Sequence, residues 1–569
     1  MASVAGVDSN AVERLKAEAN ALHREGSYQA AYQKYSEAIK EKPDKAVLSI
    51  LYANRAASCL ALKEYMDGFH DGQNVCLCQI SSSKSDHLFS QAAKLDPTYV
   101  KAWARMGTAA HVLGMWSACR YAWQSALACL PTANLTDAQL ILERQFKEGI
   151  KAADAAEAKS HSTAEKQLMY LNKDSSAPWD RALALAEENQ LVEGELPSSG
   201  FVILDAYRDF VRGIKAMQQI VINRQGDNLR IKAIPNALID ITNGLLRDTR
   251  VFHADSRFFE QLEAQIRYEG EATAAWGSGG PKRVQKEAIA RQRKEGWLPV
   301  RRALSVTVRA WIIKGFIDTN MGSLISGVEF YQRTLDLLEW GRRTWHNVAS
   351  EDRGIIFEAS FVRGVRRLHL PAVLRLYLKE GVQSGVSLET IANLARELMA
   401  ETEASVRPPD YLLNPGFYAS FWIYPAAEAL SIIGWYHMQL GLQRIDSKLD
   451  LDQEAVKTFR QASQYYIQAA DRYPEDEEER PSMLAVALEA LWWSETPLRE
   501  TLPLCRRIRA AMSKSATLWK SSQKSVTNQN AKCKDAVQFL IACEKELAEG
   551  TATLDSTLVP TDLVSNPFP

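Results

Sequence analysis

The sequence has no run of apolar residues approaching the roughly 20 that a helix needs to cross a lipid bilayer. Its first residues, Met1-Ala2-Ser3-Val4-Ala5, do not join a basic segment to an apolar one, as a secretory signal does. We therefore expect no membrane span and no secretion. An excess of charge of one sign is also missing, because 68 Lys and Arg balance 69 Asp and Glu. No overall field favours nucleic acid or a membrane surface as a partner.

Cysteine is scarce: the 569 residues include eight, which are scattered and mostly occupy apolar helical positions. This pattern is typical of free thiols in a reducing compartment. We therefore expect a cytoplasmic protein, with the nucleus as a second location.

Motifs that carry catalysis or hold cofactors are missing as well. The nine histidines have no partner at catalytic or metal-binding spacing, and no Gly-x-Ser-x-Gly, His-Glu-x-x-His or Cys-x-x-Cys occurs. The glycine-rich segment 276–281 lacks the Gly-Lys-Ser/Thr ending of a phosphate-binding loop. We predict no cofactor, no metal site and no enzymatic activity. The alternative is a helical enzyme whose site, within residues 200–420, is assembled in space without a sequence motif.

What the sequence does contain is a repeat of about 34 residues, the helix–turn–helix length of a solenoid. The first unit carries small residues, a glycine, aromatics and a closing proline in the tetratricopeptide order: Leu15, Ala19, Leu22, Gly26, Tyr28, Ala31, Tyr35, Ala38 and Pro43. The glycine allows a tight turn between two helices, and the proline ends the second helix. Further units begin near Ser49 and Val100. We predict a three-repeat solenoid over residues 10–158, closed by a capping helix from Leu135 to Ala158.

The second unit is too long by 17 residues, Val75 to Gln91, and deleting them restores the repeat register. Two explanations remain open. The segment could be a translated short intron, because Val75-Cys76 can be encoded by the splice-donor sequence GTATGT, Ser85-Asp86 can contain the branch-point sequence CTGAC, and Gln91 can be encoded by CAG. It could instead be an ordinary surface insertion, which we would expect to form a disordered loop. Transcript sequencing across the segment decides between them.

Five polar residues fall at matched positions of the repeats: Lys16, Asn20, Asn54, Lys101 and Arg105. Lys16 and Asn20 are four residues apart and share one helix face, as do Lys101 and Arg105. Two cations at this spacing repel each other by roughly a few tenths of a kcal/mol, so the second pair suggests an anionic ligand. The first helices of such repeats line the concave face of a solenoid, where these side chains would converge.

With the 17 residues removed, residues 10–150 resemble the three-repeat tetratricopeptide domains of heat-shock co-chaperones, of the dicarboxylate-clamp type. All five clamp positions of that family match the five polar residues of this chain. The resemblance implies binding of the C-terminal tail of heat-shock chaperones of the seventy- or ninety-kilodalton class, which end in Glu-Glu-Val-Asp. A terminal aspartate offers two carboxylates to such a site. The alternatives are solvated surface residues, or a scaffold that binds other acidic C-termini.

The rest of the chain is also predicted to be helical, so the expected fold class is all-α, an adaptor built from a solenoid and a large, partly tetratricopeptide-like helical region. We expect a linker over 159–200 with one helix from Trp179 to Gln190, a helical domain over 201–320, a degenerate repeat domain over 321–548 and a disordered tail over 549–569. Val202 to Val221 is predicted to form one helix face, followed by a loop at Gly226 to Asn228. Further helices are predicted at Pro235–Phe252, Ser256–Ala275, Pro425–Leu442, Ala455–Tyr473 and Met483–Trp493.

Two charged stretches of this region need separate interpretations. Lys282 to Arg302 has eight Lys or Arg and two Glu, and we expect a solvated helix face rather than a contact for nucleic acid or an acidic partner. Glu475 to Glu479 is acidic throughout and suits the positive end of a helix dipole. We expect it to form a solvated cap.

Overall fold

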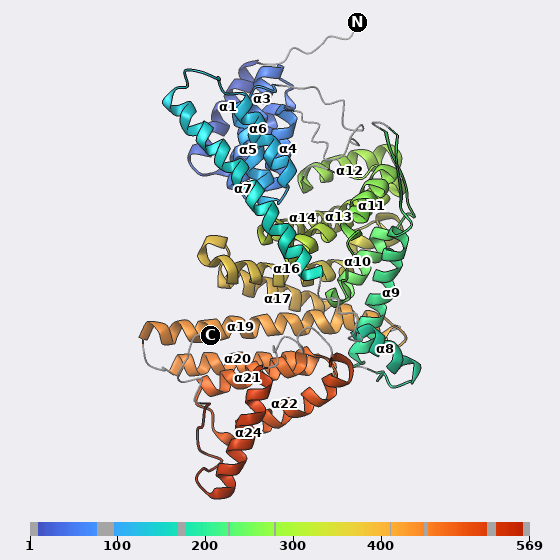
Figure 1. The fold of residues 1–569 in the computed structure, drawn as a ribbon, viewed down its shortest axis with the longest axis vertical. Coiled ribbons are helices and arrows are strands. Elements are labelled where there is room, and N and C mark those ends of the chain that lie inside the picture. Colours follow the sequence, from blue (N-terminus) through green and yellow to red (C-terminus); the bar gives the residue numbers. More distant parts are fainter. Residues whose placement is uncertain are drawn as a thin grey trace. The chain divides into compact units, whose positions relative to one another are not determined.

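The computed structural model describes residues 9–76, 96–168, 177–194, 196–225, 228–277, 280–321, 323–409, 411–448, 453–520 and 531–560. Within these ranges the chain is helical apart from one two-stranded sheet (Figure 1), so the all-α prediction is confirmed. The chain divides into two compact units that differ from the predicted domains. Unit 1 consists of Met1–Tyr170, Ala216–Leu238 and Ala254–Gly354, and unit 2 of Leu171–Lys215, Ile239–His253 and Ile355–Pro569.

The repeats of unit 1 are three pairs of helices. They are α1 (Ser9–Arg24) with α2 (Tyr28–Lys40), α3 (Lys45–Ala61) with α4 (Tyr65–Cys76), and α5 (Val100–Val112) with α6 (Trp116–Ala128). Gly26 and Gly114 occupy the turns of the first and third pairs with φ of 81° and 66°. Glycine adopts this left-handed region without steric cost, which is why the turns can be tight. The predicted repeat architecture is confirmed.

A long helix, α7 (Asp137–Leu168), packs on α6 and follows the last repeat. Two glycines let the neighbouring helices approach Trp123 of α6. A methyl group added to Gly107 of α5 or to Gly149 of α7 would lie 2.7 or 2.8 Å from a carbon of this indole. The capping helix is therefore present, and it extends beyond its predicted end at Ala158.

The suspected insertion begins at the end of α4. Val75 and Cys76 belong to α4, and Val75 is fully buried, so the predicted loop is wrong for these two residues. Its other residues lie within 77–95, outside the described part of the chain. At the junction, the backbone N–H of Asp96 donates to the carbonyl oxygen of Val75 at 3.1 Å. Val75 is the first of the 17 residues, and Ala92 takes its place in the repeat when they are removed. Asp96 follows Ala92 by four residues, so the bond has the register of an α-helical hydrogen bond. The chain thus re-enters the repeat at the position that the register predicts, whichever explanation holds.

The only sheet among the described residues is a hairpin in unit 1. Strand β1 (Val221–Gln225) pairs antiparallel with β2 (Asn228–Lys232), and Val221 lies opposite Lys232. Placing Val221 on a helical face was therefore wrong. The preceding helix, α9 (Ser199–Met217), ends before it, and β-branched residues such as Val221 and Ile222 favour a strand. The remaining helices of unit 1 are α11 (Phe258–Thr273), α12 (Pro281–Glu295), α13 (Trp297–Met321), α14 (Leu324–Thr344) and α15 (Ser350–Arg353).

Most of the basic stretch forms α12, and its last two cations, Arg301 and Arg302, lie on α13. The first turn of α12 contacts the repeat domain of the same unit. Lys282 Nζ lies 2.8 Å from Glu64 Oε1, and Arg283 Nη1 lies 3.0 Å from His70 Nε2. Both partners belong to the second repeat. The expectation of a solvated face is wrong for these two residues, because partners more than 200 positions away cannot be seen from local spacing. It holds for three later residues, which are exposed: Lys286, Arg293 and Lys294.

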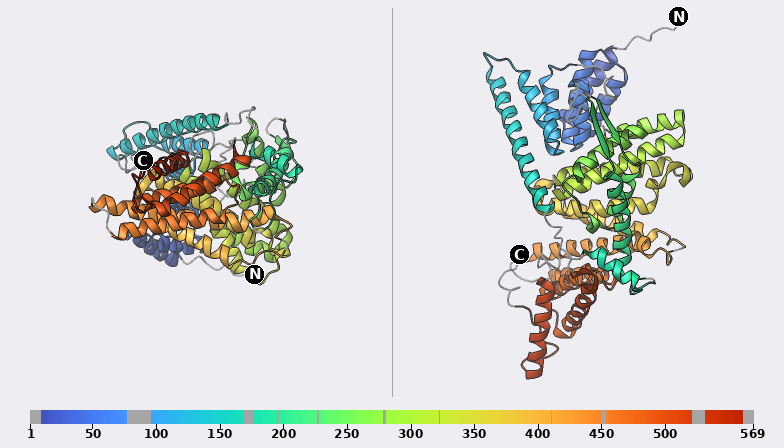
Figure 2. Two further views of the ribbon diagram at one scale, coloured as in Figure 1. Left: turned by 90° about the horizontal axis from the view of Figure 1, so that it is seen from below. Right: turned by 45° about the vertical axis from the view of Figure 1, so that its right-hand side comes forward.

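Unit 2 is built mainly from long helices (Figure 2). Three of them pack in sequence: α19 (Tyr424–Lys448), α20 (Gln453–Arg472) and α21 (Glu479–Trp493). Gly434 and Gly441 of α19 face the rings of Tyr466 and Phe459 of α20, which lets the two helices approach closely. The helices predicted for this part are present. The unit contains α8 (Pro178–Glu187), most of α9, α10 (Ala237–Arg247), α16 (Ala359–Glu380), α17 (Leu388–Ala404), α18 (Pro415–Tyr418), α19 (Tyr424–Lys448), α20 (Gln453–Arg472), α21 (Glu479–Trp493), α22 (Leu498–Trp519) and α24 (Ala531–Glu549).

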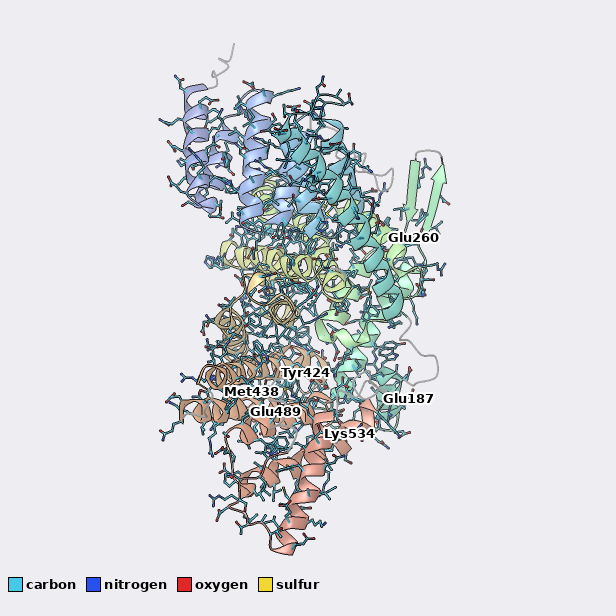
Figure 3. All side chains as sticks on the ribbon, turned by 60° about the vertical axis from the view of Figure 1, so that its left-hand side comes forward. Glu187, Glu260, Tyr424, Met438, Glu489 and Lys534 are labelled. Carbon is cyan, nitrogen blue, oxygen red and sulfur yellow. The ribbon has the colours of Figure 1, made fainter. Side chains whose placement is uncertain are left out.

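The acidic segment before α21 is a solvated cap only in part. Glu475 is exposed, as predicted, but the prediction is wrong for Glu477 and Glu478. Glu477 is fully buried and Glu478 is 8% exposed. Arg250 donates to both carboxylates, at 2.6 and 2.9 Å. The hydroxyl of Tyr424, labelled in Figure 3, also donates to Glu477. Glu477 and Glu478 are therefore part of a buried ion-pair network, and their cation, Arg250, lies more than 200 positions earlier in the sequence.

The predicted linker contains an ordered helix, and the first part of the predicted tail is ordered as well. Helix α8 lies within the predicted linker, close to the expected bounds. The backbone N–H groups of Leu498 and Arg499 donate to the carbonyls of Ser556 and Leu554 at 3.0 and 2.9 Å. The predicted disorder therefore does not hold for this first part of the tail, and residues 561–569 lie outside the described residues.

Candidate functional site

The five predicted clamp residues all lie on the first helices of the repeats. Lys16 and Asn20 are on α1, Asn54 is on α3, and Lys101 and Arg105 are on α5. Helix α3 packs against both α1 and α5, so these three helices form one continuous surface. The repeat fold therefore places all five residues on neighbouring elements.

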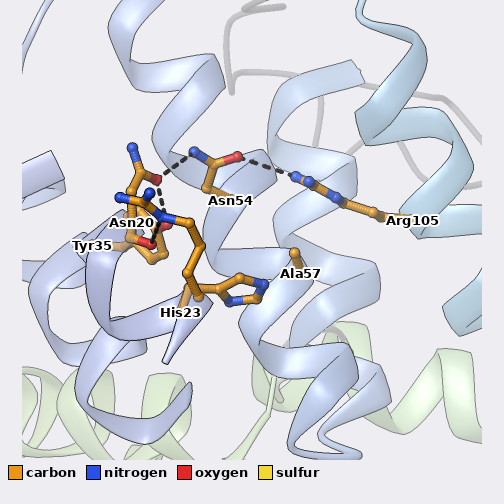
Figure 4. A pocket seen from close by; sticks show the side chains of 7 residues that line it. Asn20, His23, Tyr35, Asn54, Ala57 and Arg105 are labelled. Atoms are coloured by element: carbon orange, nitrogen blue, oxygen red, sulfur yellow. Dashed lines mark hydrogen bonds between the residues drawn. The ribbon is translucent and has the colours of Figure 1, made fainter. Parts of the chain in front are cut away.

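Asn20, Asn54 and Arg105 meet around one hollow of about 350 Å³ (Figure 4). Four further residues complete its lining: His23, Arg24, Tyr35 and Ala57. None of the seven is acidic, and two are arginines. The hollow therefore suits an anionic ligand of a few atoms, such as a carboxylate.

Hydrogen bonds connect the polar residues of the hollow and orient them. The Tyr35 hydroxyl donates to Asn20 Oδ1 at 2.6 Å, and Asn54 Nδ2 donates to the same oxygen at 3.2 Å. Arg105 Nη1 donates to Asn54 Oδ1 at 3.4 Å and to the carbonyl of Ala53. Because Asn20 Oδ1 accepts two bonds, its amide nitrogen is left to donate to a ligand.

The two lysines are near the hollow but do not line it. Lys16 precedes Asn20 by one helical turn, and its ammonium lies 2.6 Å from Glu13 Oε1. Lys101 precedes Arg105 by one turn and is exposed. The long flexible stem of lysine can bring its charge to a neighbouring anion. The structure thus brings three of the five predicted residues together and holds two cations one turn away.

Burial shapes the electrostatics of this site. It lowers the pKa of Arg105 and raises the pKa of Tyr35. The pKa of His23 is lowered, first by burial and second by the charge of Arg105. Among the described residues, Arg105 donates to the carbonyl of Ala53 and to the amide of Asn54, which are neutral acceptors. An anion entering the hollow would meet a partly desolvated cation.

Sequence reasoning missed His23, Arg24 and Tyr35. The signal for His23 was available, because it follows Asn20 by three residues and so lies on the same helix face. Tyr35 is on the second helix of the first repeat, and the repeat pattern accounts for it only as an aromatic of that unit. Its hydroxyl reaches across to Asn20, which no helical periodicity predicts.

Within the described ranges, no group of three or more His, Cys, Asp or Glu is placed to hold a metal ion. No helix in those ranges is both long and apolar enough to span a membrane.

Comparisons with known proteins agree with the repeat fold, although no protein-family profile matches the chain. The chain is 44% identical over 64 residues to a DnaJ homolog subfamily C member 7 homolog of Schizosaccharomyces pombe, covering 11% of this chain and 13% of that protein. It is 33% identical over 102 residues to the small glutamine-rich tetratricopeptide repeat-containing protein 2 of Saccharomyces cerevisiae, covering 18% and 24%. The N-terminal part is a tetratricopeptide-repeat domain.

Two further similarities cover longer parts of the chain. It is 28% identical over 152 residues to the heat shock protein sti1 homolog of S. pombe, covering 27% of this chain and 21% of that protein. The chain thus spans less than a quarter of the length of these three relatives. The solved structure of yeast Tom70 aligns over 94% of this chain and 96% of its own, with 14% identity and a TM-score of 0.21.

Proposed function

We propose that this protein is a cytoplasmic co-chaperone adaptor whose repeat domain binds the acidic C-terminal tail of heat-shock chaperones. The observation that carries the proposal is the convergence of Asn20, Asn54 and Arg105, from three different helices, around a hollow that has no acidic side chain. Relatives named as a DnaJ homolog and a heat shock protein support it. The function is equilibrium binding, with no chemistry on the peptide.

The terminal aspartate of such a tail matches the donors of the site. Arg105 offers a guanidinium to one carboxylate, and the amide of Asn20 donates without adding charge. Lys16 and Lys101 supply flexible charges at the rim. Charge-assisted hydrogen bonds contribute about 1.5–3 kcal/mol each. Removing one should therefore weaken binding by about tenfold to a hundredfold.

The test is calorimetric titration of the full chain with a peptide ending in Glu-Glu-Val-Asp and with the same peptide amidated at its C-terminus. Binding should be lost on amidation and weakened by Lys101→Ala, which is exposed and should not disturb folding. Arg14→Ala is the matched control, since it removes an exposed cation of α1. Equal binding of the free and amidated peptides would contradict the proposal.

A further inference from the structure

His23 is the titratable residue of the hollow whose role the clamp does not explain. It lies on α1 one turn after Asn20 and lines the hollow together with Asn54 and Arg105 (Figure 4). Among the lining residues it is the one whose unperturbed pKa is close to physiological pH. A change in its charge would therefore alter the electrostatics that a ligand meets.

Contacts with two other helices hold the His23 ring in place. Its Nδ1 lies 3.0 Å from the hydroxyl of Ser58 on α3. Ser58 is fully buried. Its ring packs edge-on against Tyr28 of α2, with centroids 5.1 Å apart and planes at 64°. Because Nδ1 is engaged, Nε2 is the nitrogen available to a molecule in the hollow.

The charged groups that face His23 are cations. Arg105 on α5 lowers its pKa electrostatically, and Arg24 is adjacent on α1. Helix α2 contributes the neutral phenols of Tyr28 and Tyr35, and α3 contributes Ser58 and Ala57, so neither adds a charge at neutral pH. With the hollow empty, burial and Arg105 together keep the imidazole neutral.

We propose that His23 couples ligand binding to proton uptake, so that an anionic C-terminal peptide in the hollow is bound by a protonated imidazole donating from Nε2. This proposal rests on the proposed function, and it adds a residue that determines the affinity for the peptide. The ligand carboxylate would offset the charge of Arg105 and attract a proton to His23. At a pH between the pKa values of the free and bound states, up to one proton moves from solvent to the imidazole for each peptide bound.

The sign of the pH dependence follows from this coupling. Binding raises the His23 pKa from its lowered value, so affinity increases as the pH falls through the pKa of the bound state. Affinity stops increasing once the pH is below the His23 pKa of the free protein. Each unit by which binding raises the pKa permits at most about a tenfold gain. Carboxylates of the peptide remain ionised above about pH 5, so they do not mask the effect.

The experiment is calorimetry of the full chain with a synthetic peptide ending in Glu-Glu-Val-Asp, at pH 7.5, 6.5 and 5.5. Each pH uses two buffers that differ in heat of ionisation, which gives the number of protons taken up. The wild type should bind severalfold more tightly at pH 5.5 and take up protons. His23→Gln keeps a donor that does not titrate, so its affinity and proton uptake should not change with pH.

His111→Gln is the matched control. His111 is on α5 in the same domain, and burial also lowers its pKa, but it does not line the hollow. This variant should keep the pH dependence of the wild type. A second measurement does not depend on a variant folding: in the histidine-labelled wild type, one imidazole should show a higher pKa after the peptide is added.

The outcomes separate the two proposals. If the wild type binds with the same affinity at all three pH values, or if His23→Gln takes up as many protons as the wild type, the role of His23 is overturned and the adaptor function stands. If the wild type fails to bind the peptide at any pH, the adaptor function itself is overturned.

Discussion

Asn54 is the residue that joins the two sides of the hollow. Its amide nitrogen donates to Asn20 and its oxygen accepts from Arg105. Asn54→Asp keeps the shape and the acceptor but places a negative charge beside Arg105. That charge would compete with a ligand carboxylate, so we expect affinity for an acidic C-terminal peptide to fall by more than tenfold, and further than in Asn54→Ala. Calorimetric titration of both variants measures the difference.

Asn134→Asp is the control for the added charge. Asn134 is exposed in the same domain and has φ of 56°, which Asp tolerates as Asn does. It should leave binding unchanged. If Asn54→Asp bound the peptide as tightly as Asn54→Ala, the site would not depend on the free charge of Arg105.

Arg250 is a residue on which the stability of the fold should depend. Its guanidinium pairs with three buried carboxylates, those of Asp248, Glu477 and Glu478, and lies 3.9 Å from the ring centroid of Trp519. Arg250→Met keeps an apolar stem on that ring but leaves three buried acids without their cation. Breaking a buried pair costs about 3–5 kcal/mol, so we expect a loss of this order in urea denaturation followed by circular dichroism.

Two comparisons test this explanation of Arg250. Arg499→Met removes one partner of an exposed pair with Asp555, and should cost no more than about 1 kcal/mol. Lowering the pH should partly restore Arg250→Met, because the buried acids can then become neutral. A loss that did not diminish at lower pH would indicate that packing, and not charge, is responsible.

At the scale of elements, local pattern predicted most helices, because the repeat spacing and the Gly and Pro punctuation lie within a few residues of each other. Asn20, Asn54 and Arg105 were predictable for the same reason, since register fixes the face on which they lie. The hairpin at Val221 was missed, because a strand of five residues continues the apolar pattern of the preceding helix. The partners of Glu477 and Lys282 were missed because they are more than 200 positions away.

Helix α14 makes a contact with α4 that should depend on pH. Glu329 of α14 accepts from the backbone N–H of Met66 at 2.9 Å and pairs with Arg333 at 2.7 Å. Burial raises the pKa of Glu329 to about 7, although Arg333 lowers it. A raised pKa means that the charged form costs stability, so the wild type should lose stability relative to Glu329→Gln as the pH rises from about 4.5 to about 7.

Thermal unfolding of both forms between pH 4.5 and 8 checks this expectation. The two should be similar at pH 4.5, and Glu329→Gln should be more stable at pH 8, by up to about 3 kcal/mol. Glu339→Gln, on the same helix and more exposed, should show no such trend. A glutamine variant that was less stable at every pH would mean that the attraction of Arg333 outweighs burial.

At the scale of the molecule, the repeats are part of a larger compact unit and are not a separate domain. Unit 1 joins them to Ala254–Gly354. The contacts reach the third repeat, where Ser326 Oγ donates to the carbonyl of Leu113 at 3.2 Å, and several fall on the second. Gly280 N–H donates to Asp67 at 2.8 Å, Lys282 pairs with Glu64, and Glu329 accepts from Met66. The candidate hollow uses none of these residues. Stability and peptide binding should therefore depend on different parts of unit 1.

Three fragments separate these two properties. Residues 1–354 contain all of unit 1, whereas 1–170 and 1–238 lack α11 to α14. We expect the fragment 1–354 to melt higher than both shorter ones, because these lose the contacts that Gly280 and Lys282 make with Asp67 and Glu64. The fragment 1–238 controls for length alone and should melt like 1–170. All three should bind the acidic peptide with similar affinity below their melting temperatures. If 1–170 melted as high as 1–354, the contacts with α12 and α14 would contribute nothing, and the repeats would be an independent domain.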